Sequence, residues 1–295
     1  MFQQQEQMDV NKKSALQFSL YAITSGSSNM YGQSMVDVME QAILGGADIV
    51  QLRNKAGSRA EIMEQAEQLR RLTKRYQVPF IMNDDVSIAK EVGADGVHLG
   101  QDDLLQTSVY EARNILGDNA IIGVSTHHLD QALAAQHAGA DYIGAGPVFA
   151  TPTKPGRAAV STSYIQQLAQ RVTIPFVAIG GISLDNASEV LLAGAYRLCA
   201  VRAITDSAEP RAVCEQFRSL MQQYRLPPKW MICNGVRREI YAVTIEQLID
   251  ELTISEKQKH FVVELNKEIL PRSRWSEPLL TEEASVELIT FVGGG

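Results

Sequence analysis

The strongest constraint on the fold is a regular alternation of short apolar runs with longer helical stretches. The apolar runs, which are typical of buried strands, lie at Phe18–Thr24, Ile49–Arg53, Phe80–Asn83, Gly96–Leu99, Ile121–Ser125, Tyr142–Ala145, Phe176–Ile179 and Leu198–Val201. Helical patterns follow them at Ser34–Leu44, Arg59–Tyr76, Val86–Val92, Leu104–Leu116, Leu129–Ala138, Ser161–Val172, Asn186–Ala193 and Pro210–Tyr224. Such alternation predicts βαβ units around a parallel sheet, and eight units predict an α/β fold of the closed (β/α)₈ TIM-barrel type.

An internal repeat supports the barrel. Gly-Ala-Asp occurs at Gly46–Asp48, Gly93–Asp95 and Gly139–Asp141, each time between a predicted helix and the next strand, and Gly194–Tyr196 is an altered fourth copy. Glycine commonly follows the end of a helix, so chance similarity of helix caps is the alternative explanation. The copies precede every second strand, which indicates a repeating unit of two strands and two helices.

The pattern changes after Tyr224. Arg225-Leu226-Pro227-Pro228-Lys229 contains adjacent prolines that end the helix, so residues 225–229 are predicted to form a linker. Beyond it, Met231–Asn234 and Val236–Tyr241 flank Asn234-Gly235, a strong hairpin signal.

The remaining residues complete a small second domain. Thr244–Gln247 has the spacing of a capping box and opens a predicted helix through Leu252. Phe261–Leu265 and Val286–Val292 alternate as strands do, and three glycines follow. We therefore predict a small α+β domain over residues 230–295, the barrel over 18–224 and a flexible N-terminal arm over 1–17.

Charge and composition narrow the partners. The formal net charge is −7, which argues against nucleic-acid binding. No apolar run approaches the roughly 20 residues of a membrane span, and the first residues lack the apolar stretch of a signal peptide. The three cysteines have no ligand spacing and fit reduced, packed thiols. A cytoplasmic protein without membrane contact is expected.

Polar side chains gather where the predicted strands end, which is where the active site of a (β/α)₈ barrel forms. Gln51, Arg53 and Lys55 share one face by period-two alternation, and the two cations suit a diphosphate. Asn83-Asp84-Asp85 ends the third strand, and His98 to Asp103 ends the fourth. Carboxylates from two neighbouring strands suit Mg²⁺, so Asp84 and Asp103 are the candidate ligands.

Other roles are open for several of these residues. Asp85 is placed to cap the following helix, and Asp102 or Asp103 could cap the next one. His98 lies inside a short apolar strand, where a histidine is more often part of the core than a catalyst. Ser125 could bind phosphate or cap the helix that follows it.

A stiff loop after the sixth strand suggests a second polar site. Gly144–Gly156 offers the hydroxyls of Thr151 and Thr153 and the ammonium of Lys154 between prolines, which suits a phosphate, although a solvated loop would look similar. Loops after the seventh and eighth strands often bind a monophosphate in this fold, and here they contain Gly180-Gly181 and Val201-Arg202.

Taken together, these runs resemble the thiamine-phosphate synthase family. Six motifs occur in family order: Gln-Leu-Arg-x-Lys from Gln51, Asn-Asp-Asp from Asn83, His-x-Gly-Gln-x-Asp from His98, Gly-Val-Ser-x-His from Gly123, Gly-Pro-x-x-x-Thr-x-Thr-Lys from Gly146 and Ile-Gly-Gly-Ile from Ile179. The resemblance covers residues 18–224. It implies condensation of hydroxymethylpyrimidine diphosphate with thiazole phosphate, which yields thiamine phosphate and diphosphate.

The resemblance also implies roles for individual residues. The pyrimidine diphosphate would contact Gln51, Arg53, Lys55, Asn83, Ser125 and Lys154, of which Arg53, Lys55, Ser125 and Lys154 would be catalytic. Asp84 and Asp103 would hold Mg²⁺. The thiazole phosphate would lie against Thr151, Thr153, Gly181, Val201 and Arg202. Two departures stand out: the first strand ends Ile23-Thr24-Ser25 where the family has Val-Thr-Asp, and Arg202 stands where the family commonly has Ser.

The last 65 or so residues resemble the sulfur-carrier protein of thiazole biosynthesis, which has a ubiquitin-like β-grasp fold. The similar features are the stretch Leu265–Arg272, Trp275 and the terminal Gly-Gly. The resemblance implies that Gly295 carries sulfur as a thiocarboxylate, with a carrier-activating adenylyltransferase and thiazole synthase as partners.

Three other functions are alternatives to a thiamine-phosphate synthase: a thiazole tautomerase, a thiazole synthase and a non-enzymatic scaffold with a β-grasp interaction module. The retained Gln51, Asn83 and acidic residues argue against the first, and the loop position of Lys154 argues against the second.

Overall fold

The computed structural model describes residues 16, 18–151, 158–224, 229–240, 242, 244–245, 248–249, 252, 261–275, 277, 279–281 and 283–290. The chain divides into two compact units, Met1–Tyr224 and Arg225–Gly295. Each unit is described by itself.

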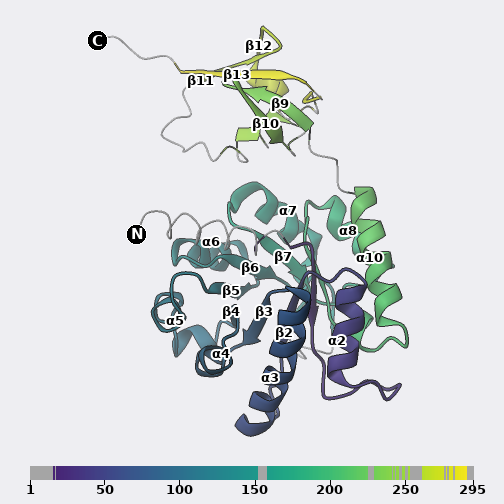
Figure 1. Ribbon diagram of the computed structural model, residues 1–295. Helices are drawn as coiled ribbons and strands as arrows, with labels where there is room; N and C mark the ends of the chain where they lie inside the picture. Colours follow the sequence, from purple (N-terminus) through teal and green to yellow (C-terminus); the bar gives the residue numbers. More distant parts are fainter. Residues whose placement is uncertain are drawn as a thin grey trace. The chain divides into compact units, whose positions relative to one another are not determined.

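The first unit is a closed barrel of eight parallel strands that pair in sequence order, with β1 closing against β8. Figure 1 shows helices surrounding these strands. The strands are β1 Leu20–Ile23, β2 Ile49–Leu52, β3 Phe80–Asn83, β4 Gly96–Leu99, β5 Ile121–Thr126, β6 Tyr142–Ala145, β7 Phe176–Ile179 and β8 Leu198–Ala200. The helices are α2 Met35–Leu44, α3 Arg59–Tyr76, α4 Val86–Val92, α5 Val109–Leu116, α6 Leu129–His137, α7 Ser161–Arg171, α8 Ala187–Leu192, α9 Arg202–Thr205 and α10 Pro210–Tyr224. The predicted TIM barrel is therefore confirmed.

One predicted helix is wrong. Instead of a continuous helix over Leu104–Leu116, a short 3₁₀ turn covers Asp103–Leu105 and α5 begins at Val109. Ser108 provides the physical reason, because its hydroxyl accepts from the Glu111 N–H while the Glu111 carboxylate accepts from the Ser108 N–H. This capping box fixes a new helix start inside the apparently continuous pattern.

Side chains divide between two apolar layers according to period-two alternation along each strand. One set faces the helices and forms the larger core, which includes Leu20, Val50 and Leu52. The other set faces the barrel interior and includes Tyr21, Ile49 and Tyr142. A closed barrel requires this division, because both faces of every strand are buried.

The aspartates of the Gly-Ala-Asp repeat hold neighbouring strands together. Asp48 accepts from the backbone N–H groups of Ser19 and Leu20, Asp95 from that of Phe80, and Asp141 from that of Ile122. Each carboxylate also pairs with an arginine from the helical layer: Arg218, Arg70 and Arg113 respectively. The repeat therefore marks one structural role at three equivalent positions, at the amino-terminal ends of the strands.

Replacing Asp95 by Ala should destabilise the barrel without altering its chemistry. The change leaves the Phe80 N–H and the Arg70 guanidinium, which is 17% exposed, without their shared carboxylate. We expect a loss of about 2–3 kcal/mol in the free energy of unfolding, measured by denaturant titration. The exposed Asp185→Ala variant is the control and should change stability by about 0.5 kcal/mol or less. Equal stability of the two variants would contradict the structural role.

The second unit is a five-stranded mixed sheet. Its strands are β9 Lys229–Cys233, β10 Val236–Ile240, β11 Phe261–Leu265, β12 Glu268–Leu270 and β13 Ser285–Thr290, in the order β10-β9-β13-β11-β12. The central strand β13 runs parallel to β9, whereas the other pairs are antiparallel. This is the β-grasp arrangement that the sequence predicted.

Local signals explain much of this sheet. The Asn234-Gly235 turn joins β9 to β10 with positive φ at both residues, as a tight hairpin requires. The predicted helix from Thr244 is described in part. The Leu248 N–H donates to the Thr244 carbonyl and the Leu252 N–H to the Leu248 carbonyl, as in a helix. Several residues between them lie outside the described part of the chain. The Phe261 and Trp275 rings stack at 5.7 Å in the core. Sequence reasoning missed β12.

Two sequence expectations concern thiols and membranes. Cys199, Cys214 and Cys233 are all buried, in agreement with the expectation of packed thiols. Within the described parts of the chain, no helix combines the length and the apolar character needed to cross a bilayer.

Candidate functional site

The predicted polar residues lie at the carboxyl ends of the barrel strands. Gln51 faces the interior near the end of β2 and is buried. Arg53 is the first residue after β2, and the Thr24 hydroxyl after β1 accepts from the Arg53 N–H at 2.9 Å. Asn83, the last residue of β3, is in register with His98 of β4. The barrel thus brings side chains from consecutive strands to one end.

Two carboxyl groups approach each other at this end. Asp84 follows β3 with φ of +63°, a left-handed conformation that is unusual for a residue other than glycine. Burial raises the pKa of its carboxyl above the usual range; Lys55 acts to lower that pKa, and the hydrogen bond with Asp103 acts to raise it. The Lys55 Nζ lies 2.9 Å from the Asp84 Oδ2. Two carboxyl groups close enough to share a hydrogen bond, such as those of Asp84 and Asp103, favour a proton or a cation between them.

The neighbouring aspartates have distinguishable roles. Asp85 is the N-cap of α4, where its Oδ1 accepts from the Ile88 N–H at 2.8 Å, as the sequence predicted. Asp103 accepts from the Gly100 N–H at 2.9 Å and opens the 3₁₀ turn. Asp102 makes no side-chain cap bond there. Asp84 and Asp103 are therefore the acidic pair at the strand ends.

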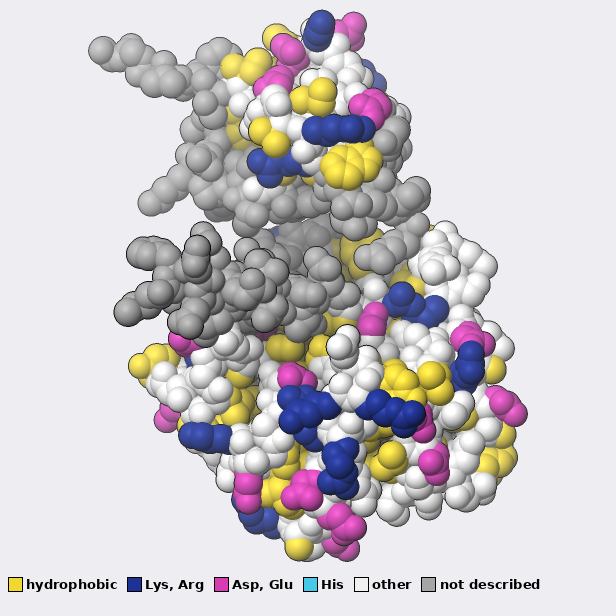
Figure 2. All heavy atoms as spheres, in the orientation of Figure 1, with side chains coloured by type: hydrophobic (Ala, Val, Ile, Leu, Met, Phe, Trp, Pro, Cys, Tyr) yellow, Lys and Arg dark blue, Asp and Glu magenta, His cyan; other side chains and the backbone are white. Residues whose placement is uncertain are grey.

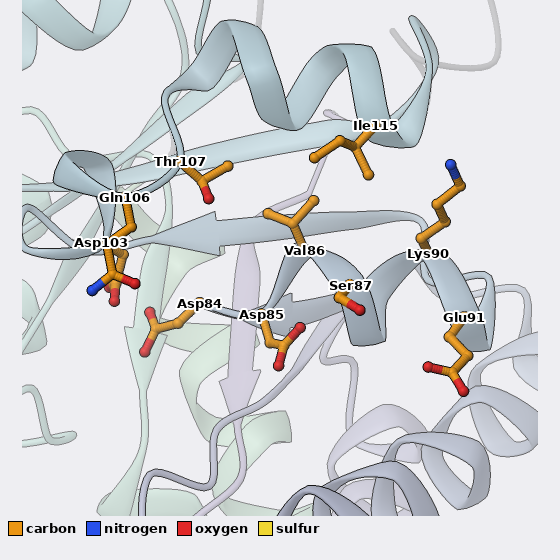
Figure 3. Close-up of a pocket in the computed structure, with 10 residues that line it drawn as sticks. All are labelled: Asp84, Asp85, Val86, Ser87, Lys90, Glu91, Asp103, Gln106, Thr107 and Ile115. Carbon is orange, nitrogen blue, oxygen red and sulfur yellow. The ribbon is translucent and has the colours of Figure 1, made fainter.

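An open groove of about 700 Å³ extends from this pair. Figure 3 shows the Asp84 and Asp103 carboxyls facing each other at one end, with Lys90 and Glu91 at the other. Among the described residues, no group of three or more His, Cys, Asp or Glu side chains forms a metal cluster. The acidic pair fits Mg²⁺ nonetheless, because this ion is usually held by one or two carboxylates and completed by substrate phosphate and water.

A line of hydrogen bonds, which we call the interior chain, runs through the barrel from Gln51 to Ser125. The Gln51 Nε2 donates to the Tyr21 hydroxyl at 3.0 Å, and the Tyr21 and Tyr142 hydroxyls are 2.9 Å apart. The Tyr142 hydroxyl lies 2.9 Å from His98 Nδ1, and His98 Nε2 lies 2.9 Å from Ser125 Oγ. Sequence reasoning treated His98 as a core residue and did not single out either tyrosine.

A second cavity, of about 320 Å³, lies between the loops after β6, β7 and β8. It brings together four of the five residues that the resemblance assigned to the thiazole phosphate: Thr151, Gly181, Val201 and Arg202. Arg202 is exposed and begins the short helix α9, whose C-cap residue Asp206 also lines the cavity.

Two glycines that line this cavity allow the loops beside it to pack closely. Gly180 and Gly181 both have positive φ. A Cβ at Gly180 would lie 2.4 Å from the Pro147 side chain, and one at Gly181 would lie 2.8 Å from the Ala150 carbonyl oxygen. Glycine is therefore required for the loops after β6 and β7 to pack this closely.

Three predicted site residues lie outside the described part of the chain: Thr153, Lys154 and Gly295. The surface of the small domain is partly described. Trp230, Val236 and Ile289 are each at least two-fifths exposed, and the Arg237 guanidinium lies 5.2 Å from the Trp230 ring centre. Figure 2 shows hydrophobic side chains exposed among charged ones on this domain.

The fold and site define a class: a (β/α)₈ barrel with an acidic pair and a separate cavity at its strand ends, joined to a β-grasp domain. Residues 20–204 match the family described as thiamine monophosphate synthase, and residues 231–295 match the ThiS family. The chain belongs to the thiamine monophosphate synthase family and carries a ThiS-family domain at its C-terminal side.

Similar proteins support the assignment. The thiamine-phosphate synthase of Halalkalibacterium halodurans is 48% identical over 70% of this chain and 96% of its own length. That of Chloroflexus aurantiacus is 45% identical over 68% of this chain and 92% of its own length. A thiamine phosphate pyrophosphorylase structure from Pyrococcus furiosus superposes with a TM-score of 0.63 at 34% identity, covering 72% of this chain and 98% of that one.

Proposed function

We propose that the barrel condenses hydroxymethylpyrimidine diphosphate with thiazole phosphate to give thiamine phosphate and diphosphate, as a step of thiamine biosynthesis. The observation that carries this proposal is the division of the polar barrel end into two places. The acidic pair with Lys55 forms one, and the cavity beside Arg202 forms the other. Two phosphorylated substrates need two such places.

The proposed binding roles follow this division. The pyrimidine diphosphate is bound by residues on the β2, β3 and β5 side and by the loop lysine, namely Gln51, Arg53, Lys55, Asn83, Ser125 and Lys154. The thiazole phosphate is bound in and around the second cavity, by Thr151, Thr153, Gly181, Val201 and Arg202. The shared cavity lining of Thr151, Gly181, Val201 and Arg202 supports the second assignment.

The reaction is a substitution at the methylene carbon of the pyrimidine. The bond from this carbon to the diphosphate oxygen breaks, and its electron pair leaves with the diphosphate. The lone pair of the thiazole nitrogen then forms the new carbon–nitrogen bond. Electron donation from the pyrimidine ring favours a dissociative course, so the protein contributes orientation and charge rather than a covalent nucleophile.

Arg53, Lys55 and Lys154 stabilise the charge that develops on the departing diphosphate. Mg²⁺, which Asp84 and Asp103 would hold, supplies further positive charge to that leaving group when bound. The ion pair between Lys55 and Asp84, 2.9 Å from Nζ to Oδ2, supports this assignment because it brings Lys55 beside one of the two proposed metal ligands.

The second domain serves the same pathway as a sulfur carrier. We propose that the Gly295 carboxylate is adenylated by a carrier-activating adenylyltransferase and then converted to a thiocarboxylate for thiazole synthase. The ThiS-family match and the exposed apolar side chains of the domain support a partner-binding role. The division into arm 1–17, barrel 18–224, linker 225–229 and carrier 230–295, and a cytoplasmic location, belong to this proposal.

The test is to incubate the purified chain with both substrates, with and without Mg²⁺. Diphosphate and thiamine phosphate should appear in equal amounts, and removal of Mg²⁺ with a chelator should suppress both. A tautomerase would act on the thiazole alone and release no diphosphate, so the absence of diphosphate would overturn the proposal.

Replacing Arg202 by Ser should separate the two substrates kinetically. If the guanidinium pairs with the thiazole phosphate, KM for that substrate should rise about tenfold while KM for the pyrimidine diphosphate stays within about twofold. The exposed Arg71→Ser variant on α3 removes the same charge elsewhere and should change neither. Equal increases in both KM values, or no change, would contradict the assignment.

A further inference from the structure

The interior chain has a direction that starts at Gln51. An amide nitrogen donates hydrogen bonds and cannot accept them, so the Tyr21 hydroxyl accepts from Gln51. The distance between the Tyr21 and Tyr142 hydroxyls allows either one to donate, but among the hydrogen bonds described for Tyr21 its proton has an acceptor only when Tyr21 donates to Tyr142. The Tyr142 hydroxyl then gives its proton to His98 Nδ1. Burial raises the pKa of both phenols, so each keeps its single proton at neutral pH.

The proton of His98 is fixed by this direction. Because Nδ1 accepts from Tyr142, the single proton of the neutral imidazole stands on Nε2 and is donated to Ser125 Oγ. Ser125 uses a lone pair in that bond, and its own hydroxyl proton is left for another acceptor. We propose that Tyr21, Tyr142 and His98 are positioning residues that orient the Ser125 hydroxyl as a donor to an anionic oxygen of the diphosphate substrate. This proposal rests on the proposed function.

A charged His98 does not fit the same hydrogen bonds. With protons on both nitrogens, His98 would donate to Tyr142, and Tyr142 would have to donate to Tyr21. Tyr21 would then accept from both Tyr142 and Gln51, and its own buried proton would have no acceptor among the hydrogen bonds described for it. Burying an unsatisfied donor is costly, so the chain favours the neutral imidazole.

The barrel makes specific room for this chain. Gly123 on β5 faces the interior, and a Cβ there would lie 2.1 Å from Cζ of Tyr142. Gly144 on β6 faces the same side, and its Cβ would lie 3.1 Å from Cε1 of His98. The Tyr142 ring therefore occupies space that a side chain at Gly123 would need, and the His98 ring, 5.4 Å from that of Tyr142, lies against Gly144.

The first experiment reads the proton directly. Nitrogen-15 NMR of the full-length, ligand-free protein distinguishes a protonated Nε2 from a protonated Nδ1, and the His98→Gln variant assigns the His98 signals. We expect neutral His98 with its proton on Nε2 at neutral pH. A proton on Nδ1, or on both nitrogens, would overturn the proposal. This measurement needs no substrate, so it decides the proton arrangement even if the chain makes no thiamine phosphate, which would contradict the proposed function instead.

The second experiment interrupts the interior chain of hydrogen bonds with the Tyr142→Phe variant, which lacks the hydroxyl between Tyr21 and His98. We expect kcat/KM for the pyrimidine diphosphate to fall about tenfold, the order expected for one hydrogen bond, while KM for the thiazole phosphate is unchanged. The Nε2-protonated form of His98 should also lose its dominance in the NMR spectrum. Tyr164→Phe is the matched control. The buried hydroxyl of Tyr164 donates to Thr126 Oγ1 at 2.7 Å and takes no part in the interior chain. Equal kinetic effects of the two variants, or no effect of Tyr142→Phe, would overturn the positioning role.

Discussion

Replacing Asp84 by Asn should lower the turnover of thiamine-phosphate synthesis at least about 100-fold, the order seen when one key electrostatic group is lost. Asn is nearly the same size and tolerates the left-handed backbone, with φ of +63°, that Asp84 adopts, so the fold should be retained. The change removes one of the two carboxylates proposed to hold Mg²⁺. Turnover and Mg²⁺ dependence, measured by diphosphate release, are the readouts.

The same variant should be at least as stable as the native protein at neutral pH. Burial raises the pKa of the Asp84 carboxyl in the folded state, so the charged form is less favourable there than in the unfolded chain. Removing the charge thus relieves an unfavourable contribution above the unfolded pKa. This gain should shrink as pH falls through the raised folded pKa and vanish below the unfolded one. Denaturant titrations at several pH values would measure it.

The neighbouring Asp85→Asn variant is the matched control. It removes a charge of the same kind one residue away, and Asn retains the N-cap bond to Ile88 because it is an equally good cap. Its turnover should stay within about twofold of the native value. Near-normal turnover of Asp84→Asn, or equal losses in the two variants, would rule out the metal assignment. Lower turnover together with undiminished stability would be the pattern of a functional residue.

The barrel could be predicted from the sequence because short apolar runs alternate regularly with longer helical stretches. The bounds of β3, β4, β6 and β7 match the predicted ranges to the residue. The region around Ser108 was mispredicted because a capping box inside a helical pattern overrides its periodicity. The strand β12 was missed because Glu268–Leu270 is short, and its hairpin turn at Asn266-Lys267 contains no glycine.

The site was predictable only in part, because a local sequence pattern identifies single residues but not the contacts between distant ones. Polar residues at strand ends stand out singly, so Arg53, Lys55 and the acidic residues could be named from the sequence. The interior chain depends on pairs far apart along the chain, such as Tyr21 with Tyr142, and no local pattern shows which strands adjoin. The signal that was available is the alternation along each strand, which places Gln51, His98, Ser125 and Tyr142 on the side that faces the barrel interior.

The carrier activity should depend on the last residues and leave the synthase unaffected. The strand β13 pairs with β11 on one side and β9 on the other, so Thr290, the last described residue, ends the central strand of the sheet. Residues 291–295 lie outside the described part. Glycine has no Cβ, which lets a tail of this composition enter a narrow channel to the nucleotide of an activating enzyme.

Incubating the intact chain with that enzyme, ATP and a sulfur donor should yield a thiocarboxylate at Gly295. ATP first converts the carboxylate to an acyl adenylate with release of diphosphate. Hydrosulfide from the sulfur donor then attacks the acyl carbon and displaces AMP, which carries away one carboxylate oxygen, so this oxygen is replaced by sulfur. Mass spectrometry of the C-terminal peptide should show this exchange. Deletion of Gly294 and Gly295 should abolish it while thiamine-phosphate synthesis continues at the native rate, because the two chemistries use different domains.

The detached domain, residues 230–295, is the informative comparison. If it gains sulfur and the intact chain does not, the carrier does not function in the fused form. If neither gains sulfur, the carrier assignment itself is wrong. Sulfur transfer to both, combined with loss of transfer on deletion of the two glycines, would establish that one chain both supplies sulfur for the thiazole and joins the finished thiazole phosphate to the pyrimidine.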